Sequence, residues 1–165
     1  MNIRRAERDD IAALAELHRG EGWCYDDEAV LNDYWDDSFD KEGILVADVD
    51  GRVVGTIEVA KAYKARFGFF AVVRRFVVHP DYRGRGIGGA LIREALEEAE
   101  RKGCNAIELS VDPANVRSHE FYETLGFRDD RTEVIMVKLL DQALEAKDDR
   151  SGREAPSSAC SSARC

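Results

Sequence analysis

Short apolar stretches bounded by turn-forming residues recur through the first half of the chain. β-Branched, aliphatic and aromatic residues dominate them, as is typical of strands. They predict strands at Asn2–Arg5, Gly43–Val49, Arg52–Ala60 and Phe67–Val78. Asp50-Gly51, between the second and third of these, is a strong signal for a two-residue hairpin turn. Residues 43–78 are therefore expected to form an antiparallel meander.

Apolar residues repeat at helical spacing in four other stretches. Ile11, Leu14 and Leu17 follow Asp9, a predicted N-cap, and this helix ends at Gly20. A second, short helix is predicted near Asp27–Trp35. A third begins at Gly84–Gly89 and runs to about Lys102, before Gly103. A fourth follows an Asp112-Pro113 cap and ends at Leu125.

The second half adds two strands, Cys104–Val111 and Thr132–Leu140. The predicted order is β-α-α-β-β-β-α-β-α-β, which indicates a single α/β domain with a mixed sheet over residues 1–140. No aliphatic residue larger than alanine follows Leu144. Residues 141–165 are therefore expected to form a flexible tail.

Charge and composition exclude several classes of protein. The chain of 165 residues has 33 acidic and 24 basic side chains, a net charge of −9, which disfavours nucleic acid as a partner. The longest apolar run, Phe67–Val73, is too short to cross a membrane, and the first ten residues lack a signal-peptide pattern. Cysteines and histidines show no metal-binding spacing, so we expect no metal site and a reducing, cytoplasmic location.

The most specific motif is a glycine-rich loop that precedes a predicted helix. It consists of Arg83, Gly84, Arg85, Gly86, Ile87, Gly88 and Gly89. Glycines let backbone N–H groups close on an anion, and the helix N-terminus adds unpaired donors, so the loop suits a pyrophosphate. The alternative is a turn that only packs strand against helix. A dinucleotide fingerprint is disfavoured because the preceding strands form an antiparallel meander.

Two segments carry a resemblance to a known family. Arg83, Gly86 and Gly88 match the pattern Q/R-x-x-G-x-G/A, and Asn115 is followed by Phe121-Tyr122-Glu123-Thr124-Leu125-Gly126-Phe127. Together they resemble the acetyl-CoA signature and the downstream segment of the GCN5-related N-acetyltransferase (GNAT) family, from about Ile3 to Leu140. The resemblance implies a GNAT-like domain in which an antiparallel meander is followed by a parallel strand pair that splays to hold acetyl-CoA.

The resemblance also implies roles for individual residues in acetyl transfer from acetyl-CoA to a primary amine. Phe76, Val77 and Val78 would contact the pantetheine arm, and the N–H of Val78 or a neighbour would polarise the thioester carbonyl. The glycine-rich loop would hold the pyrophosphate, and Asn115 would contact the pantetheine or phosphate side. Tyr122 would contact the cosubstrate and act as general acid toward the leaving thiolate; the alternative is a core tyrosine.

The sequence identifies the general base less clearly than the general acid. Ser110 stands where one branch of the family has a glutamate, which leaves Glu58 on a neighbouring strand as the best carboxylate. A solvated strand residue is the alternative for Glu58. Arg74 and Arg75 cannot act as bases; they could bind a carboxylate or phosphate of a substrate or pair with local acids.

The acceptor is expected beside an acidic, aromatic stretch at residues 21–42, which has nine acidic residues and one basic residue. Trp23, Tyr25, Asp26 and Ser110 are the predicted acceptor contacts, and a solvated helix face is the alternative for the stretch. These features predict N-acetylation of a small cationic amine in a ternary complex. A protein N-terminal or lysine acetyltransferase and a non-catalytic acyl-CoA-binding module stay open, as does a homodimer.

Overall fold

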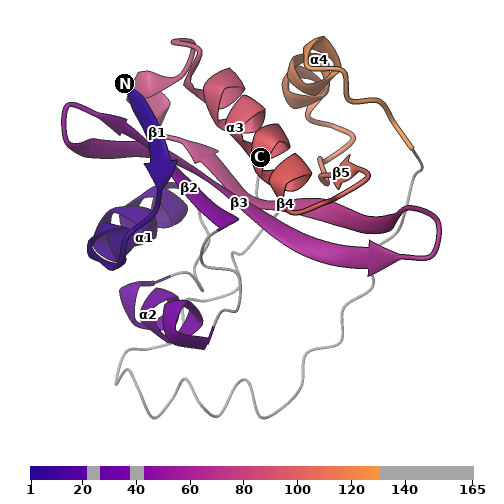
Figure 1. Ribbon diagram of the computed structural model, residues 1–165. Helices are drawn as coiled ribbons and strands as arrows, with labels where there is room; N and C mark the ends of the chain where they lie inside the picture. Colours follow the sequence, from indigo (N-terminus) through magenta and orange to yellow (C-terminus); the bar gives the residue numbers. More distant parts are fainter. Residues whose placement is uncertain (22–26, 38–42, 131–165) are drawn as a thin grey trace, which may run out of the picture.

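A computed structural model describes residues 1–21, 27–37 and 43–130 of the chain. It consists of one sheet with helices on both faces (Figure 1). The elements in chain order are β1 (Asn2–Arg5), η1 (Arg8–Asp10), α1 (Ile11–Gly20), α2 (Glu28–Asp37), β2 (Ile44–Val49), β3 (Arg52–Lys64), β4 (Gly68–Val78), η3 (Pro80–Tyr82), α3 (Ile87–Arg101), β5 (Ile107–Glu108) and α4 (Val116–Thr124).

The five strands lie in the order β1-β2-β3-β4-β5. The first four pair antiparallel, and β5 pairs parallel with β4. This confirms the mixed sheet and the meander. Asp50 and Gly51 both have positive φ angles, 54° and 82°, as a two-residue turn between β2 and β3 requires.

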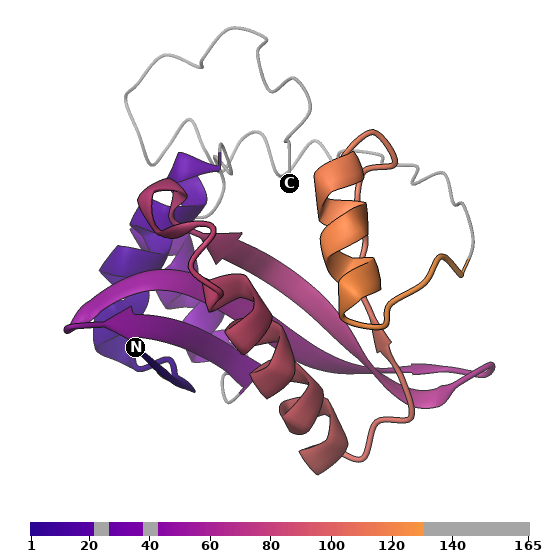
Figure 2. The ribbon, with the colours of Figure 1, turned by 90° about the horizontal axis from the view of Figure 1, so that it is seen from above.

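Helices lie on both faces of the sheet (Figure 2), and an apolar cluster holds them on each face. One face packs against α3, where Leu45, Ile57, Val59, Leu91 and Ile92 form part of a buried cluster. The other face packs against α1 and α2 through a second cluster that includes Leu14, Leu31, Ile44 and Val46. Alternate residues of β2 enter opposite clusters, because successive side chains of a strand point to opposite faces.

Two predicted helix caps are wrong. Helix α4 is capped by Asn115, whose Oδ1 accepts the N–H of Ser118 at 3.2 Å. Asp112 instead accepts the N–H of Ala114 within the preceding turn. Helix α1 follows the 3-10 turn η1, so Asp9 is not its cap.

Strand β5 covers only Ile107–Glu108 of the predicted Cys104–Val111, and the reason for this lies at the site described below. The predicted strand Thr132–Leu140 and the tail 141–165 lie outside the described residues. Among the residues that the structure describes, no helix is long and apolar enough to span a membrane.

Candidate active site

A β-bulge interrupts β4 two residues before its C-terminal end. Thr56 pairs with Val77 and Glu58 pairs with Arg74, so Arg75 and Phe76 together face the single residue Ile57. Arg75 has φ +45°, which is uncommon for a residue with a side chain. Such bulges re-aim side chains and commonly lie next to active sites.

Strands β4 and β5 separate after Val72, two residues before this bulge. Their register has only two pairs, Ala71 with Ile107 and Val72 with Glu108. Beyond Val72, the described pairing of β4 is with β3 alone. The short β5 therefore reflects a divergence of two strands that start as parallel neighbours.

The divergence leaves backbone groups of β4 facing the side that β5 has left. The N–H of His79 donates to Val54 O at 2.8 Å, and Val78 is the next residue toward the bulge, opposite Gly55. Because hydrogen-bonded and non-bonded pairs alternate in an antiparallel ladder, the N–H of Val78 points away from β3. This hydrogen-bond donor is thus directed toward the diverging edge, where an extended ligand could accept from it.

The glycine-rich loop lies between η3 and α3 and is open at two glycines. Gly84 and Gly86 have φ angles of +75° and +79°, and a Cβ built at either position would meet no atom within 4 Å. Packing therefore does not require glycine here, whereas the backbone conformation does. Gly86 is also the N-cap of α3 and offers no capping side chain, so the first-turn N–H groups face the loop without one.

The two arginines of the loop form contacts with the residues around it. Arg83 Nε donates to Val78 O at 2.8 Å, and its guanidinium also pairs with Glu21 at the C-terminal end of α1. Arg85 donates to Asp81 O at 2.8 Å and lies over the Tyr82 ring, 5.0 Å from its centroid. Since a guanidinium has five N–H groups, each arginine keeps donors for an anion, but part of its role is to shape the turn.

Tyr122 on α4 belongs to an aromatic cluster that reaches the bulge. Its ring lies 6.3 Å from Phe76, 5.3 Å from Phe121 and 5.8 Å from Phe127, measured between centroids. A Cβ on Gly88 would lie 3.4 Å from the Phe76 ring and 3.5 Å from the Phe121 ring. The structure thus brings Phe76, the loop and Tyr122 together, whereas the Oδ1 of Asn115 is engaged as the α4 cap.

Glu58 is buried, which contradicts the solvated alternative. Its side chain is 3% exposed, and it accepts hydrogen bonds from Tyr34 Oη at 2.7 Å and from an Arg75 guanidinium nitrogen at 2.6 Å. The Arg75 guanidinium also stacks over the Tyr34 ring, 4.5 Å from its centroid. Helix α2, β3 and the β4 bulge therefore meet at one carboxylate.

The predicted acceptor contacts are only partly described. Ser110 is exposed, two residues beyond the end of β5, and Trp23, Tyr25 and Asp26 lie outside the described residues. Sequence reasoning missed Tyr34 as a partner of Glu58. Its only signal was a place in the aromatic, acidic stretch, because the contact depends on how α2 packs on the sheet.

Comparison with known proteins agrees with this geometry. The model of the Acetyltransferase (GNAT) family matches residues 11–127. An uncharacterized N-acetyltransferase of Archaeoglobus fulgidus is 34% identical over 137 residues, covering 78% of this chain and 93% of that protein. The L-amino acid N-acyltransferase MnaT of Escherichia coli is 28% identical and covers 77% and 79% of the two chains.

A solved structure shows the same fold. The aminoglycoside N-acetyltransferase AAC(6′)-Iy, in complex with CoA, superimposes with a TM-score of 0.71 at 19% identity, over 83% of this chain and 93% of that one. The chain belongs to the GNAT family, and it is an N-acetyltransferase, as its sequence predicted.

Proposed function

We propose that this enzyme transfers the acetyl group of acetyl-CoA to a small cationic primary amine by direct attack in a ternary complex. One observation carries the proposal: the β4 bulge, the divergence from β5, the open glycine loop and Tyr122 all lie around one edge of β4. MnaT is named for L-amino acids and the superimposed AAC(6′)-Iy for aminoglycosides, and both are small molecules that carry amines.

The donor site follows from the diverging edge. The pantetheine arm would run along Phe76, Val77 and Val78, where β4 has no parallel partner among the described residues. The pyrophosphate would bind the open backbone from Gly84 to Gly89, where the N-terminus of α3 adds positive partial charge. The N–H of Val78 or a neighbour would stabilise the carbonyl oxygen as negative charge develops on it.

The chemistry needs three proton transfers. An alkylamine is protonated at neutral pH, so a base must take one proton before the nitrogen attacks the thioester carbon. We assign this role to Glu58, directly or through water, with Tyr34 and Arg75 holding its carboxylate in place. The C–N bond then forms, the C–S bond breaks, and Tyr122 donates its phenolic proton to the leaving thiolate. The second proton of the attacking nitrogen passes to the Tyr122 oxygen, directly or through water, which leaves a neutral amide and restores the phenol.

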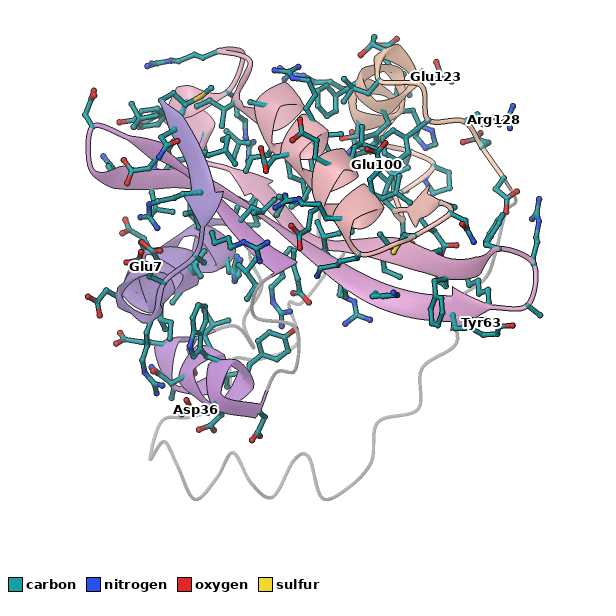
Figure 3. All side chains as sticks on the ribbon, in the orientation of Figure 1. Glu7, Asp36, Tyr63, Glu100, Glu123 and Arg128 are labelled. Carbon is teal, nitrogen blue, oxygen red and sulfur yellow. The ribbon has the colours of Figure 1, made fainter. Side chains whose placement is uncertain are left out.

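Tyr122→Phe tests this assignment with little change in packing. Loss of a general acid should lower kcat about 10²- to 10⁴-fold, while the acetyl-CoA Kd should stay within about twofold. Thiol release with acetyl-CoA and a panel of primary amines gives kcat, and calorimetry gives the Kd. Tyr63→Phe is the matched control, because Tyr63 is 67% exposed near the tip of the β3–β4 hairpin (Figure 3).

The outcome is decisive in either direction. An unchanged kcat in Tyr122→Phe would remove Tyr122 from the chemistry. Failure of the unmodified enzyme to release thiol with every amine, while acetyl-CoA still binds, would instead favour a non-catalytic acyl-CoA-binding module.

A further inference from the structure

A second arginine lies beside the buried carboxylate of Glu58. Arg74 is directly opposite Glu58 in the β3–β4 register, so both side chains are on the same face of the sheet. That face is the one under α2, because Tyr34 of α2 donates to Glu58 from the same side. Arg74 thus lies on the face that carries the proposed base, which is the side from which an amine would approach.

Two arginines face the single carboxylate of Glu58. Tyr34 and Arg75 take one oxygen of Glu58 each, at 2.7 Å and 2.6 Å. Arg74 is 4.0 Å from the same carboxylate and forms no hydrogen bond with any residue that the structure describes. Arg75 is the closer partner of Glu58, at 2.6 Å, and Arg74 is the more distant one. The Arg74 side chain is 55% exposed, so its donors are accessible.

The position of Arg74 along β4 places it close to the proposed reaction site. Arg74 is two residues beyond Val72, the last residue of β4 that pairs with β5, and it directly precedes the bulge. At a rise of about 3.3 Å per residue, Phe76 is only about 7 Å further along the strand. A group bound to Arg74 would therefore lie close to a thioester held along Phe76–Val78.

We infer that Arg74 binds a carboxylate of the acceptor, so that the acceptor is an amine that also carries a carboxylate, such as an amino acid. This inference rests on the proposed function. The planar guanidinium of arginine can bind a carboxylate through two parallel hydrogen bonds. The ammonium group of a lysine is a point charge and cannot form this bidentate contact. Tyr34, Glu58 and Arg75 would stay paired with one another and leave Arg74 to the substrate.

The kinetic test compares each acceptor with its own amide. L-Phenylalanine, L-methionine and L-lysine are measured beside their amides, which keep the amine and lack the carboxylate charge. Arg74→Gln should lower kcat/KM for the amino acids about 10- to 100-fold, mainly through KM, and leave the amides within about twofold. Arg74→Lys should recover only part of the loss. The intrinsic difference between acid and amide cancels, because both are measured on each variant.

Arg66→Gln is the matched control. Arg66 has a similar exposed fraction, 58%, but lies at the hairpin tip, where it pairs with Asp130 at 2.7 Å. It should behave as the unmodified enzyme does. Equal loss for acids and amides in Arg74→Gln, or no loss, would overturn the inference while the proposed transfer stands.

Equilibrium binding separates the inference from the proposed function. Calorimetry with protein saturated with CoA measures the affinity for each acid and amide without turnover. A preference for the acids that disappears in Arg74→Gln supports the subsite even if no thiol is released. Equal affinities for acids and amides in the unmodified protein overturn it even if the enzyme is active.

Discussion

Among single residues, Asp10 shows how a buried charge is held in this fold. Its carboxylate accepts hydrogen bonds from Arg4 at 2.7 Å and 2.8 Å and from the N–H of Glu7 at 2.8 Å. Burial acts to raise its pKa, but the hydrogen bonds from Arg4 and Glu7 and the charge of Arg4 together hold the pKa below its ordinary value. The ionised form is therefore the one that the fold stabilises.

The lowered pKa of Asp10 predicts a stability that depends on pH. The contribution is complete above the unfolded pKa, about 3.9, and is lost as the pH falls through the lower folded pKa. Asp10→Asn should lower the free energy of unfolding by about 1–3 kcal/mol at pH 7 and flatten the loss below about pH 4. Urea unfolding across this range measures both. Asp9→Asn, at an exposed neighbouring position, should change neither, and an equal effect there would contradict the assignment.

Single residues of the site differ in how far they could be predicted. Gly84 and Gly86 were identified from sequence because their requirement is local: each needs a positive φ angle in a loop before a helix. The partners of Glu58 were not, because Tyr34 is 24 positions away and Arg75 reaches it only through a bulge. No periodicity in the sequence marks where one extra residue enters a strand.

At the scale of elements, the glycine loop leads directly into α3 through a backbone conformation that glycine adopts without strain and other residues do not. Gly86 is the left-handed N-cap of α3, with φ +79° and open space where a side chain would stand. Gly86→Ala should therefore cost about 1–2 kcal/mol through backbone conformation, with no steric clash. It should also weaken acetyl-CoA binding, because the loop must shift to relieve the strain.

A thermal unfolding series and calorimetry with acetyl-CoA check this effect. Gly20→Ala is the control: Gly20 ends α1, has no positive φ angle and has open space around it, so alanine should be neutral or slightly stabilising. If Gly86→Ala bound acetyl-CoA as tightly as the unmodified protein, the loop would not be the pyrophosphate site.

Element boundaries were less predictable than the elements themselves. The apolar pattern of Cys104–Val111 suits a full strand, yet the ladder with β4 covers only Ile107–Glu108. Asn105 and Ala106 add single backbone hydrogen bonds to Phe69 and Ala71, and beyond Glu108 the two strands diverge ahead of the bulge. Asp112 and Asn115 have similar capping propensity, and sequence alone does not rank them. The helix begins after Asn115 because Asp112 is already used in the turn that follows β5.

In the whole molecule, the β4–β5 junction is the narrow connection between two parts. Strands β1 to β4 share long registers and are covered on both faces by apolar clusters. The β5–α4 segment joins them through a ladder of two residue pairs, the backbone hydrogen bonds of Asn105 and Ala106, the Lys64–Glu108 ion pair, and the aromatic contacts of Phe76 with α4. Acetyl-CoA bound between the diverging strands would add contacts across this junction.

Hydrogen exchange with and without acetyl-CoA tests this view of the whole molecule. When the acetyl-CoA concentration is 100 times its Kd, binding stabilises the folded protein by about 2.7 kcal/mol. Amide groups that exchange only when acetyl-CoA is absent from its site should then exchange roughly 100-fold more slowly. The slowing should be concentrated in residues 76–90 and 107–125, which contain the diverging edge, the loop and α4. Residues 44–49 of β2 lie two strands from that edge and are the internal reference. Protection confined to the α1 and α2 face would contradict the proposed acetyl-CoA site. Acetyl-CoA would then contact α1, α2 and β3, on the opposite side of the sheet, rather than β4, α3 and α4.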